Sequence, residues 1–409
     1  MRFLFRQATG DAGALLTLPW TQPLEEWDDD LLLEVPQRGL SRHVVRFVSS
    51  EGAVFALKEI HERLARHEYG LLGELAADGL PVVTALGVCV DRPHGLDAIL
   101  VTRYLEYSMS YRYLFSRPGT LHSPDQLIDA MVELLVRLHL GGVFWGDCSL
   151  SNTLFRLDAG AFAAYLVDAE TAERHATLSA GQRNYDVEIA TERVGAELLD
   201  LEAGGLLPST IDPVAIADEL PGRYGALWDE VTREEVFRLD EQRFRVAERL
   251  QRLNDLGFAV GEVELVTSED GARLKVRTQV AEPGQHRREL FRLTTLEVQE
   301  NQARRLLNDL RSFRAHLEQR YGAPVPETFA GHRWLAEVYQ PVVDAIPPDL
   351  VGRLEPAEVF HEVLEHRWFL SERAGRDVGT RAAARSYFAT VLPQTPREVT
   401  TPSVIAQAP

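Results

Sequence analysis

Short hydrophobic runs rich in Val, Phe and Ile, bounded by turn residues, predict a group of β-strands in the first part of the chain. Ser49-Ser50-Glu51-Gly52 separates two of these runs and is typical of a hairpin turn. An irregular lead-in precedes most of the strands. We expect strands near residues 3–5, 43–48, 54–58, 81–90 and 98–104, and hairpins over 152–168 and 258–280.

Apolar residues that recur every three or four positions predict helices. The first helix is expected to end at Asp78-Gly79, and a later one begins at Ser123-Pro124-Asp125-Gln126, where serine would cap the helix and proline takes its first position. Thr232-Arg233-Glu234-Glu235 has a similar capping pattern and predicts another helix start. The helices are expected over residues 62–77, 124–139 and 232–256, around 306–317, and over 356–374.

The chain is acidic and shows no membrane segment. Its 409 residues include 43 Lys and Arg against 62 Asp and Glu, a formal charge of −19. Nucleic acid is therefore disfavoured as a partner, because phosphate binding needs a basic face. No run approaches the roughly 20 apolar residues that cross a bilayer, and the apolar start is too short for a secretory signal, so we expect a cytoplasmic protein without membrane insertion. Cys89 and Cys148 are expected to be reduced thiols.

One segment, residues 281–320, is locally basic. It contains Arg287, Arg288, Arg292, Arg304, Arg305, Arg311 and Arg314. These arginines fit the solvated face of an amphipathic helix and its flanking segment. Two alternatives are a docking surface for an anionic substrate and a surface that binds the chain's own acidic part.

Lysine is rare in this chain, and one lysine lies in an apolar strand. Lys58 and Lys275 are the only lysines in the sequence. Lys58 follows Val54-Phe55-Ala56-Leu57, where a buried ammonium needs a carboxylate or a phosphate as its partner. A strand-end lysine that reaches solvent is the alternative.

Polar residues surround the predicted hairpin at 152–168. If Asp158-Ala159-Gly160-Ala161 turns the chain, its strands pair antiparallel and bring Asn152 opposite Asp168. Asp147 lies five residues before Asn152 in a short polar loop. An aspartate that accepts a hydroxyl proton, with an asparagine and a second aspartate that hold Mg²⁺, is what phosphoryl transfer requires. The alternative is a polar loop that only caps the hairpin.

Glu68 is the expected partner of Lys58. It lies four residues after Leu64 and three before Leu71, on the apolar face of the helix predicted over 62–77. An unpaired carboxylate buried there would cost several kcal/mol. Glu62 is the competing partner, but it groups with more polar residues.

Together these residues resemble the protein-kinase-like fold. The resemblance rests on Lys58, Glu68, Leu138-His139-x-x-Gly142, Trp145-Gly146-Asp147-x4-Asn152 and Val167-Asp168-Ala169-Glu170, in that order, over roughly residues 36–200. The atypical bacterial branch of lipopolysaccharide kinases and aminoglycoside-type phosphotransferases is the most similar. As a whole the chain also resembles an uncharacterised actinobacterial family in which such a domain precedes one of unknown function.

The resemblance implies a role for each residue. Lys58 would bind the α- and β-phosphates of ATP, Glu68 would orient Lys58, and Asp147 would be the catalytic base. Asn152 and Asp168 would bind Mg²⁺. The backbone of Arg103, Tyr104 and Leu105, within the hinge at 102–106, would receive adenine.

The chain departs from the family pattern at three positions. No G-x-G-x-x-G covers the phosphates, so Gly39, Ser41 and Arg42, in the turn at 38–43, would take its place. Gly146 stands where an arginine precedes the base in eukaryotic kinases. Ala169-Glu170 follows Asp168 in place of Phe-Gly, and Glu170 adds an acidic group near the metal. Asp186 would brace the catalytic loop from the following helix.

We therefore expect an α+β protein with a two-lobed kinase-like domain and an α-rich C-terminal domain that contains a small β-hairpin. The expected parts are the lead-in and N-lobe at 1–104, the C-lobe at 105–215, the C-terminal domain at 216–392 and a disordered tail at 393–409. The predicted activity is ATP- and Mg²⁺-dependent transfer of the γ-phosphoryl group to a hydroxyl of a sugar, small molecule or protein. The alternative is a non-catalytic nucleotide-binding or regulatory scaffold that acts through its C-terminal domain.

Overall fold

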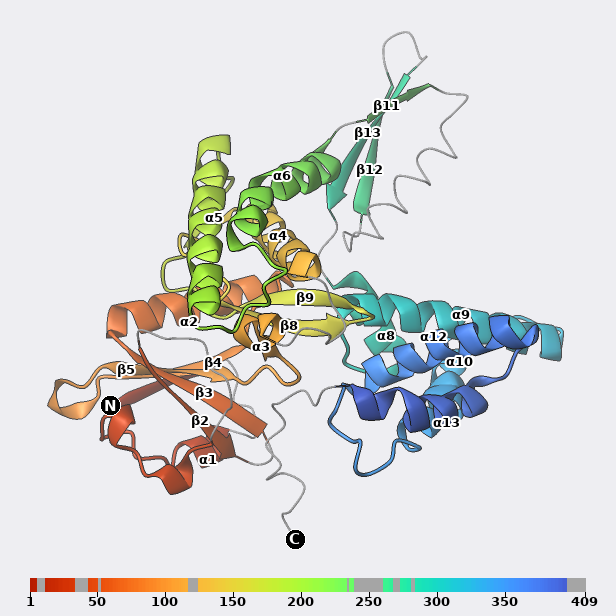
Figure 1. Ribbon diagram of the computed structural model, residues 1–409, viewed down its shortest axis with the longest axis horizontal. Coiled ribbons are helices and arrows are strands. Elements are labelled where there is room, and N and C mark those ends of the chain that lie inside the picture. The colour runs from red at the N-terminus through yellow and green to blue at the C-terminus, as the bar shows by residue number, and fades with distance from the viewer. Residues whose placement is uncertain are drawn as a thin grey trace. The chain divides into compact units, whose positions relative to one another are not determined.

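A computed structural model of the chain contains two compact units (Figure 1). The structure describes residues 1–5, 12–33, 43–50, 53–116, 124–233, 235–238, 260–267, 273–280 and 284–395. The first unit contains residues 1–156 and 162–227. The second contains residues 228–398 together with 157–161, a short piece from the middle of the first unit's sequence.

The first unit begins with a five-stranded antiparallel sheet in the order β1-β4-β5-β3-β2. Its strands are β1 (Arg2–Phe5), β2 (Val44–Ser50), β3 (Ala53–Ile60), β4 (Ala85–Val90) and β5 (Ala98–Arg103). The predicted strand near residues 3–5 is thus the edge strand β1. Residues 81–83 of the expected fourth strand lie outside this sheet, because Val82 instead bridges to Leu166.

Different segments of the chain pack against the two faces of this sheet. Helix α2 (Glu62–Ala77) contacts β4 and β5, and Ala65 packs in a buried cluster with Ile60 and Val88. The other cluster contains Trp20 and Trp27 from the lead-in, which also holds α1 (Ala12–Leu15) and two 3-10 turns, η1 (Leu24–Glu26) and η2 (Asp29–Leu31). The irregular lead-in is therefore part of the core. A third 3-10 turn, η3 (Pro93–Gly95), lies between β4 and β5.

The rest of the first unit is mostly helical. Its helices are α3 (Tyr111–Phe115), α4 (Pro124–Leu140), α5 (Ala180–Ala203) and α6 (Pro213–Thr232), the last of which runs into the second unit. The strands β6 (Met109–Ser110), β8 (Thr153–Asp158) and β9 (Ala161–Leu166) form a sheet, and β7 (Val143–Phe144) pairs with β10 (Glu173–Arg174). The predicted helix over 124–139 and the hairpin within 152–168 are confirmed.

The second unit combines one small sheet with a group of helices. The sheet has the order β11-β13-β12, with β11 (Glu235–Arg238), β12 (Val260–Thr267) and β13 (Arg273–Val280). The helices are α8 (Gln285–Thr294), α9 (Glu300–Tyr321), α10 (Glu327–Trp334), the π-helical turn η4 (Leu335–Tyr339), α11 (Gln340–Val343), α12 (Pro356–Ala374), α13 (Thr380–Thr390) and the 3-10 turn η5 (Leu392–Gln394). The predictions over 258–280, 306–317 and 356–374 are confirmed. Residues 396–409 of the expected tail are not among the described residues.

The helix predicted to start at Thr232 is wrong. Thr232 is the last residue of α6, and its hydroxyl donates to the Trp228 carbonyl one turn earlier, so it does not cap a new helix. Residues Glu235–Arg238 form β11, which pairs with β13. The rest of the expected helix lies mostly outside the described residues. The Thr-x-x-Glu pattern does mark a helix boundary, but this boundary is the end of α6 and not the start of a new helix.

Within the described residues, no helix combines the length and the apolar character that crossing a bilayer requires.

Candidate active site

The predicted pair of Lys58 and Glu68 is present in the structure. Lys58 lies on β3 and Glu68 on the buried side of α2, and the Lys58 Nζ to Glu68 Oε2 distance is 3.1 Å. Glu68 is 1% exposed, and its second oxygen accepts a hydrogen bond from the Ala169 amide at 3.2 Å. The competitor Glu62 instead pairs with Arg66. Glu68 thus holds both the lysine and the backbone after Asp168.

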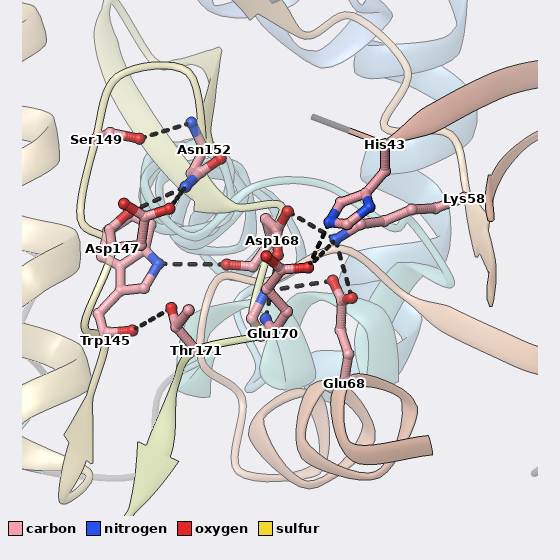
Figure 2. A network of polar contacts seen from close by, with 11 residues as sticks. His43, Lys58, Glu68, Trp145, Asp147, Ser149, Asn152, Asp168, Glu170 and Thr171 are labelled. Carbon is pink, nitrogen blue, oxygen red and sulfur yellow. Dashed lines mark hydrogen bonds and ion pairs between the residues drawn. The ribbon is translucent and has the colours of Figure 1, made fainter. Parts of the chain in front are cut away.

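Two more carboxylates meet the same ammonium (Figure 2). The Lys58 Nζ atom lies 2.6 Å from Asp168 Oδ2 and 3.4 Å from Glu170 Oε2. Burial opposes the charged ammonium, but the carboxylates of Glu68 and Asp168 outweigh it and raise the pKa of Lys58. Burial, with the neighbouring Asp168 charge, raises the pKa of Glu68 to about 7 in spite of Lys58. One ammonium therefore faces three acidic side chains.

The loop with Asp147 lies on the other side of Asp168 (Figure 2). Asn152 Nδ2 donates to Asp147 Oδ2 at 3.2 Å and to the Asp147 carbonyl at 3.0 Å. The Trp145 indole donates to the Asp168 carbonyl at 3.3 Å. At the base of the hairpin, the Val167 amide donates to the Asn152 carbonyl at 3.1 Å. Asp147, Asn152 and Asp168 are therefore held in one hydrogen-bonded network.

Helix α5 supports the backbone of this loop through side-chain hydrogen bonds, as predicted for Asp186. Asp186 is fully buried and accepts hydrogen bonds from the amides of Trp145 at 2.6 Å and Gly146 at 2.9 Å. His139 lies 3.1 Å from the same carboxylate. Further along α5, Glu197 accepts from the amides of Leu150 and Ser151 at 2.8 and 3.0 Å. The loop backbone is thus fixed at both ends.

The predicted hinge, residues 102–106, begins on the last two residues of β5. The Arg103 amide donates to the Thr84 carbonyl and the Tyr104 amide to the Val54 carbonyl. These two amides are therefore bound to backbone carbonyls of the same lobe and do not point to an adenine. Leu105 is half-buried and follows one residue later. Among the three hinge residues, it is the one whose amide donates to no backbone carbonyl in the described part of the chain.

The predicted phosphate-covering residues Gly39, Ser41 and Arg42 lie outside the described residues. The last residue of the same turn, His43, is described. Its Nε2 atom lies 2.9 Å from Glu170 Oε2, so this side chain faces the acidic cluster (Figure 2).

The donors around Asp168 fit a hard divalent cation. One carboxylate oxygen from each of Glu68, Asp168 and Glu170 lies within 4.8 Å of the other two. Because the amide nitrogen of Asn152 binds Asp147, its amide oxygen is the atom left to face a cation. Oxygen ligands of this kind suit Mg²⁺. The three carboxylates around the single Lys58 ammonium also leave the cluster with acidic groups in excess, which favours a cation. Asp168 and Asn152 would hold the ion, with Glu170 beside them.

Sequence reasoning missed three side chains of the site. Arg193 on α5 lies 3.3 Å from Asp147 Oδ1, and Glu197 and His43 make the contacts given above. Arg193 and Glu197 belong to a long helix whose position relative to the loop depends on tertiary packing. The signal in the sequence was the spacing, because Arg193 follows Asp186 by seven residues and Glu197 follows Arg193 by four, which places these three side chains on one helix face.

Three arginines of the arginine-rich segment pair with acidic residues of the same unit, and most arginines of the segment are exposed. Arg292 and Arg314 pair with Glu327, and Arg311 pairs with Glu289. The solvated-helix interpretation is therefore favoured over a docking surface for anions.

Two family models match separate parts of the chain. Residues 54–189 match the lipopolysaccharide kinase (Kdo/WaaP) family, and residues 226–392 match a domain of unknown function, DUF4032. No curated protein matches the chain. Among solved structures, "WaaP in complex with acyl carrier protein" is similar at 17% identity with a TM-score of 0.36, covering 63% of this chain and 99% of that one.

The family match covers Lys58, Glu68, Asp147, Asn152 and Asp168. It places the two-lobed arrangement of the first unit, with its sheet followed by helices, among kinase-like α+β folds. The chain therefore combines a region that matches the lipopolysaccharide kinase (Kdo/WaaP) family, residues 54–189, with a region that matches a domain of unknown function, DUF4032, residues 226–392.

Proposed function

We propose that this protein is an ATP- and Mg²⁺-dependent phosphotransferase that phosphorylates a hydroxyl group. The observation that carries the proposal is the ion pair of Lys58 with Asp168, 2.6 Å across the two lobes, next to the hydrogen-bonded pair of Asp147 and Asn152. Four polar groups that phosphoryl transfer uses thus come together from separate parts of the chain.

In the proposed reaction the acceptor oxygen attacks the γ-phosphorus and the bond to the β,γ-bridging oxygen breaks, which yields a phosphate ester and ADP. Asp147 orients the acceptor hydroxyl and takes its proton on a carboxylate oxygen. Lys58, held by Glu68, binds the α- and β-phosphates and offsets their charge. Bound Mg²⁺ would neutralise phosphate charge, with Asn152 and Asp168 as its protein ligands.

The backbone at Leu105 is the proposed adenine contact. The amides of Arg103 and Tyr104 already donate to backbone carbonyls, so the adenine edge would meet the chain one residue later. Gly39, Ser41 and Arg42 are proposed to cover the phosphates. The acceptor itself stays open among sugar, small-molecule and protein hydroxyls.

Thermal unfolding with ATP, with Mg²⁺ and with both tests the nucleotide site. We expect the melting temperature of the wild type to rise only with both ligands, because binding to the folded state stabilises it by about 2.7 kcal/mol at a hundredfold excess over Kd. Lys58→Met and Asp168→Asn should abolish the rise. Lys275→Met, which changes the only other lysine of the sequence, is the matched control and should keep it.

The alternative, a scaffold without catalysis, predicts other results. A wild type that gains no stability from saturating MgATP would contradict our proposal. Stabilisation by MgATP without any ADP formed over a panel of hydroxyl acceptors would favour a nucleotide-binding scaffold.

A further inference from the structure

The turn between β8 and β9 belongs to the second unit, although its strands belong largely to the first. Its two central residues, Ala159 and Gly160, have φ values of 55° and 78°, as in the tight type I′ turns of β-hairpins. Both amides donate to the carboxylate of Glu358 on α12, each at 2.8 Å. A single buried side chain of the second unit therefore binds the whole tip of the hairpin.

Asp158, the last residue of β8, binds another helix of the same unit. Its two oxygens accept hydrogen bonds from the amides of Asn301 at 3.0 Å and Gln302 at 2.7 Å, in the first turn of α9. These amides have no acceptor within the helix, and a negative charge at a helix N-terminus is favourable. Asp158 thus caps α9 from more than a hundred residues away.

Gln302 links the two carboxylates. Its side-chain nitrogen, Nε2, donates to Glu358 Oε2 at 2.9 Å and to the Leu157 carbonyl at 3.3 Å, while its backbone amide binds Asp158. Gln302 is fully buried, and Asp158 and Glu358 are 3% and 1% exposed. Because the bonds are buried and involve charged acceptors, removing one partner leaves the others unsatisfied at considerable cost.

The same hairpin ends at the candidate active site. β8 begins directly after Asn152, and β9 ends two residues before Asp168. The hydrogen bond from the Val167 amide to the Asn152 carbonyl closes this end. A two-stranded hairpin has little stability of its own, and the third strand of this sheet, β6, contributes only Met109 and Ser110.

We infer that the second unit positions the two metal-binding residues by holding the hairpin tip. Asp158, Gln302 and Glu358 are positioning residues, and they act on Asn152 and Asp168 through the strands. The effect on metal binding rests on the proposed function, but the mechanical link along the hairpin does not.

Hydrogen exchange of the full-length protein without nucleotide tests the link. We expect Glu358→Gln to speed exchange at least tenfold both at the tip and at the far end, including the Val167 amide. Asp309→Asn is the matched control, since it changes a carboxylate of the same unit that binds the Trp334 indole instead. It should leave 152–168 unchanged. Faster exchange confined to 159–160 in the Glu358 variant would overturn the inference.

Isothermal titration of Mg²⁺ at saturating ATP tests the positioning role. We expect Glu358→Gln and Asp158→Asn to weaken Mg²⁺ binding about tenfold while circular dichroism stays that of the wild type, and Asp309→Asn to bind normally. If the wild type binds MgATP and both variants bind it equally well, the positioning role is wrong and the proposed function stands. If the wild type binds no MgATP, the proposed function fails, and hydrogen exchange still decides the link.

Discussion

At the residue scale, Asp147 accepts a hydrogen bond from the side-chain amide of Asn152 and lies 3.3 Å from the guanidinium of Arg193. Arg193 is 57% exposed at its side chain, so it can leave Asp147 to an acceptor at little cost. The carboxylate is 14% exposed and is thus reachable without being fully solvated.

We expect Asp147→Asn to reduce phosphoryl transfer by about 10²–10⁴-fold, since an amide cannot accept the hydroxyl proton. The Kd for MgATP should change little, because the proposal assigns phosphate binding to Lys58 and metal binding to Asn152 and Asp168. Steady-state kinetics and calorimetry measure the two quantities. Asp200→Asn, an exposed aspartate of α5, is the control. Full activity in the Asp147 variant would sink the assignment of the base.

Ala159 predicts an unusual result for a glycine substitution. Its φ of 55° is strained for a residue with a side chain, so Ala159→Gly should raise the free energy of unfolding by about 1 kcal/mol. Ala161→Gly, at the exposed start of β9, should instead lower it by about 0.5–1 kcal/mol. Urea denaturation compares them, and a loss of stability in both would contradict the strain at Ala159.

The pairing of Lys58 with Glu68 could be predicted from sequence because both residues lie in regular elements, where periodicity shows which side is buried. The contacts of Arg193 and Glu358 could not. Each joins segments far apart in the chain, and only tertiary packing brings such segments together.

At the element scale, one face of α5 supports the site. Asp186, Arg193 and Glu197 all reach the loop over 145–152. Burial raises the pKa of Glu197, although the two loop amides oppose this. The helix thus fixes the backbone of a loop that has no regular secondary structure of its own.

Helix α10 approaches α8 closely at Gly331. A Cβ atom there would lie 2.5 Å from the Leu293 carbonyl oxygen, so the helices must separate to admit it. We expect Gly331→Ala to lower the free energy of unfolding by about 1–3 kcal/mol. Gly222→Ala on α6, where a Cβ atom meets nothing within 4 Å, should raise it by about 0.5–1 kcal/mol. The denaturant midpoints of the two variants measure these changes. Equal changes in stability for Gly331→Ala and Gly222→Ala would contradict the close approach of the helices.

Most elements could be predicted because hydrophobic periodicity marks them directly, as for α12 and the β12–β13 hairpin. The start at Thr232 failed because a Thr-x-x-Glu pattern fits the end of one helix as well as the start of another. The lead-in gave no periodic signal, yet Trp20 and Trp27 are nearly fully buried, since large aromatic side chains can fill a core without regular structure.

At the scale of the whole molecule, buried acids make stability depend on pH. Burial, with Glu358 and Glu365 nearby, raises the pKa of Glu362 from 4.5 to about 7. Between these pH values the folded chain holds a proton that the unfolded chain has lost, so the free energy of unfolding falls as pH rises.

Glu362→Gln should remove that part of the pH dependence. We expect the variant to match the wild type near pH 5 and to be about 1–3 kcal/mol more stable at pH 8. Urea unfolding at both pH values measures this, with Glu372→Gln, an exposed glutamate of the same helix, as the control. A variant whose advantage is the same at both pH values would disprove the shift.

The hairpin tip also affects how the protein is made. Asp158 precedes its α9 partner by 144 residues, and Gly160 precedes Glu358 by 198. At about 5–20 residues per second, a ribosome needs roughly 7–40 s to synthesise the chain between them. Throughout that interval the β8–β9 hairpin of the nascent chain has a turn whose binding partners have not yet been synthesised. Its maturation therefore ends only when α12 leaves the ribosome, and a chain that stops earlier exposes the unfinished hairpin to chaperones and proteases.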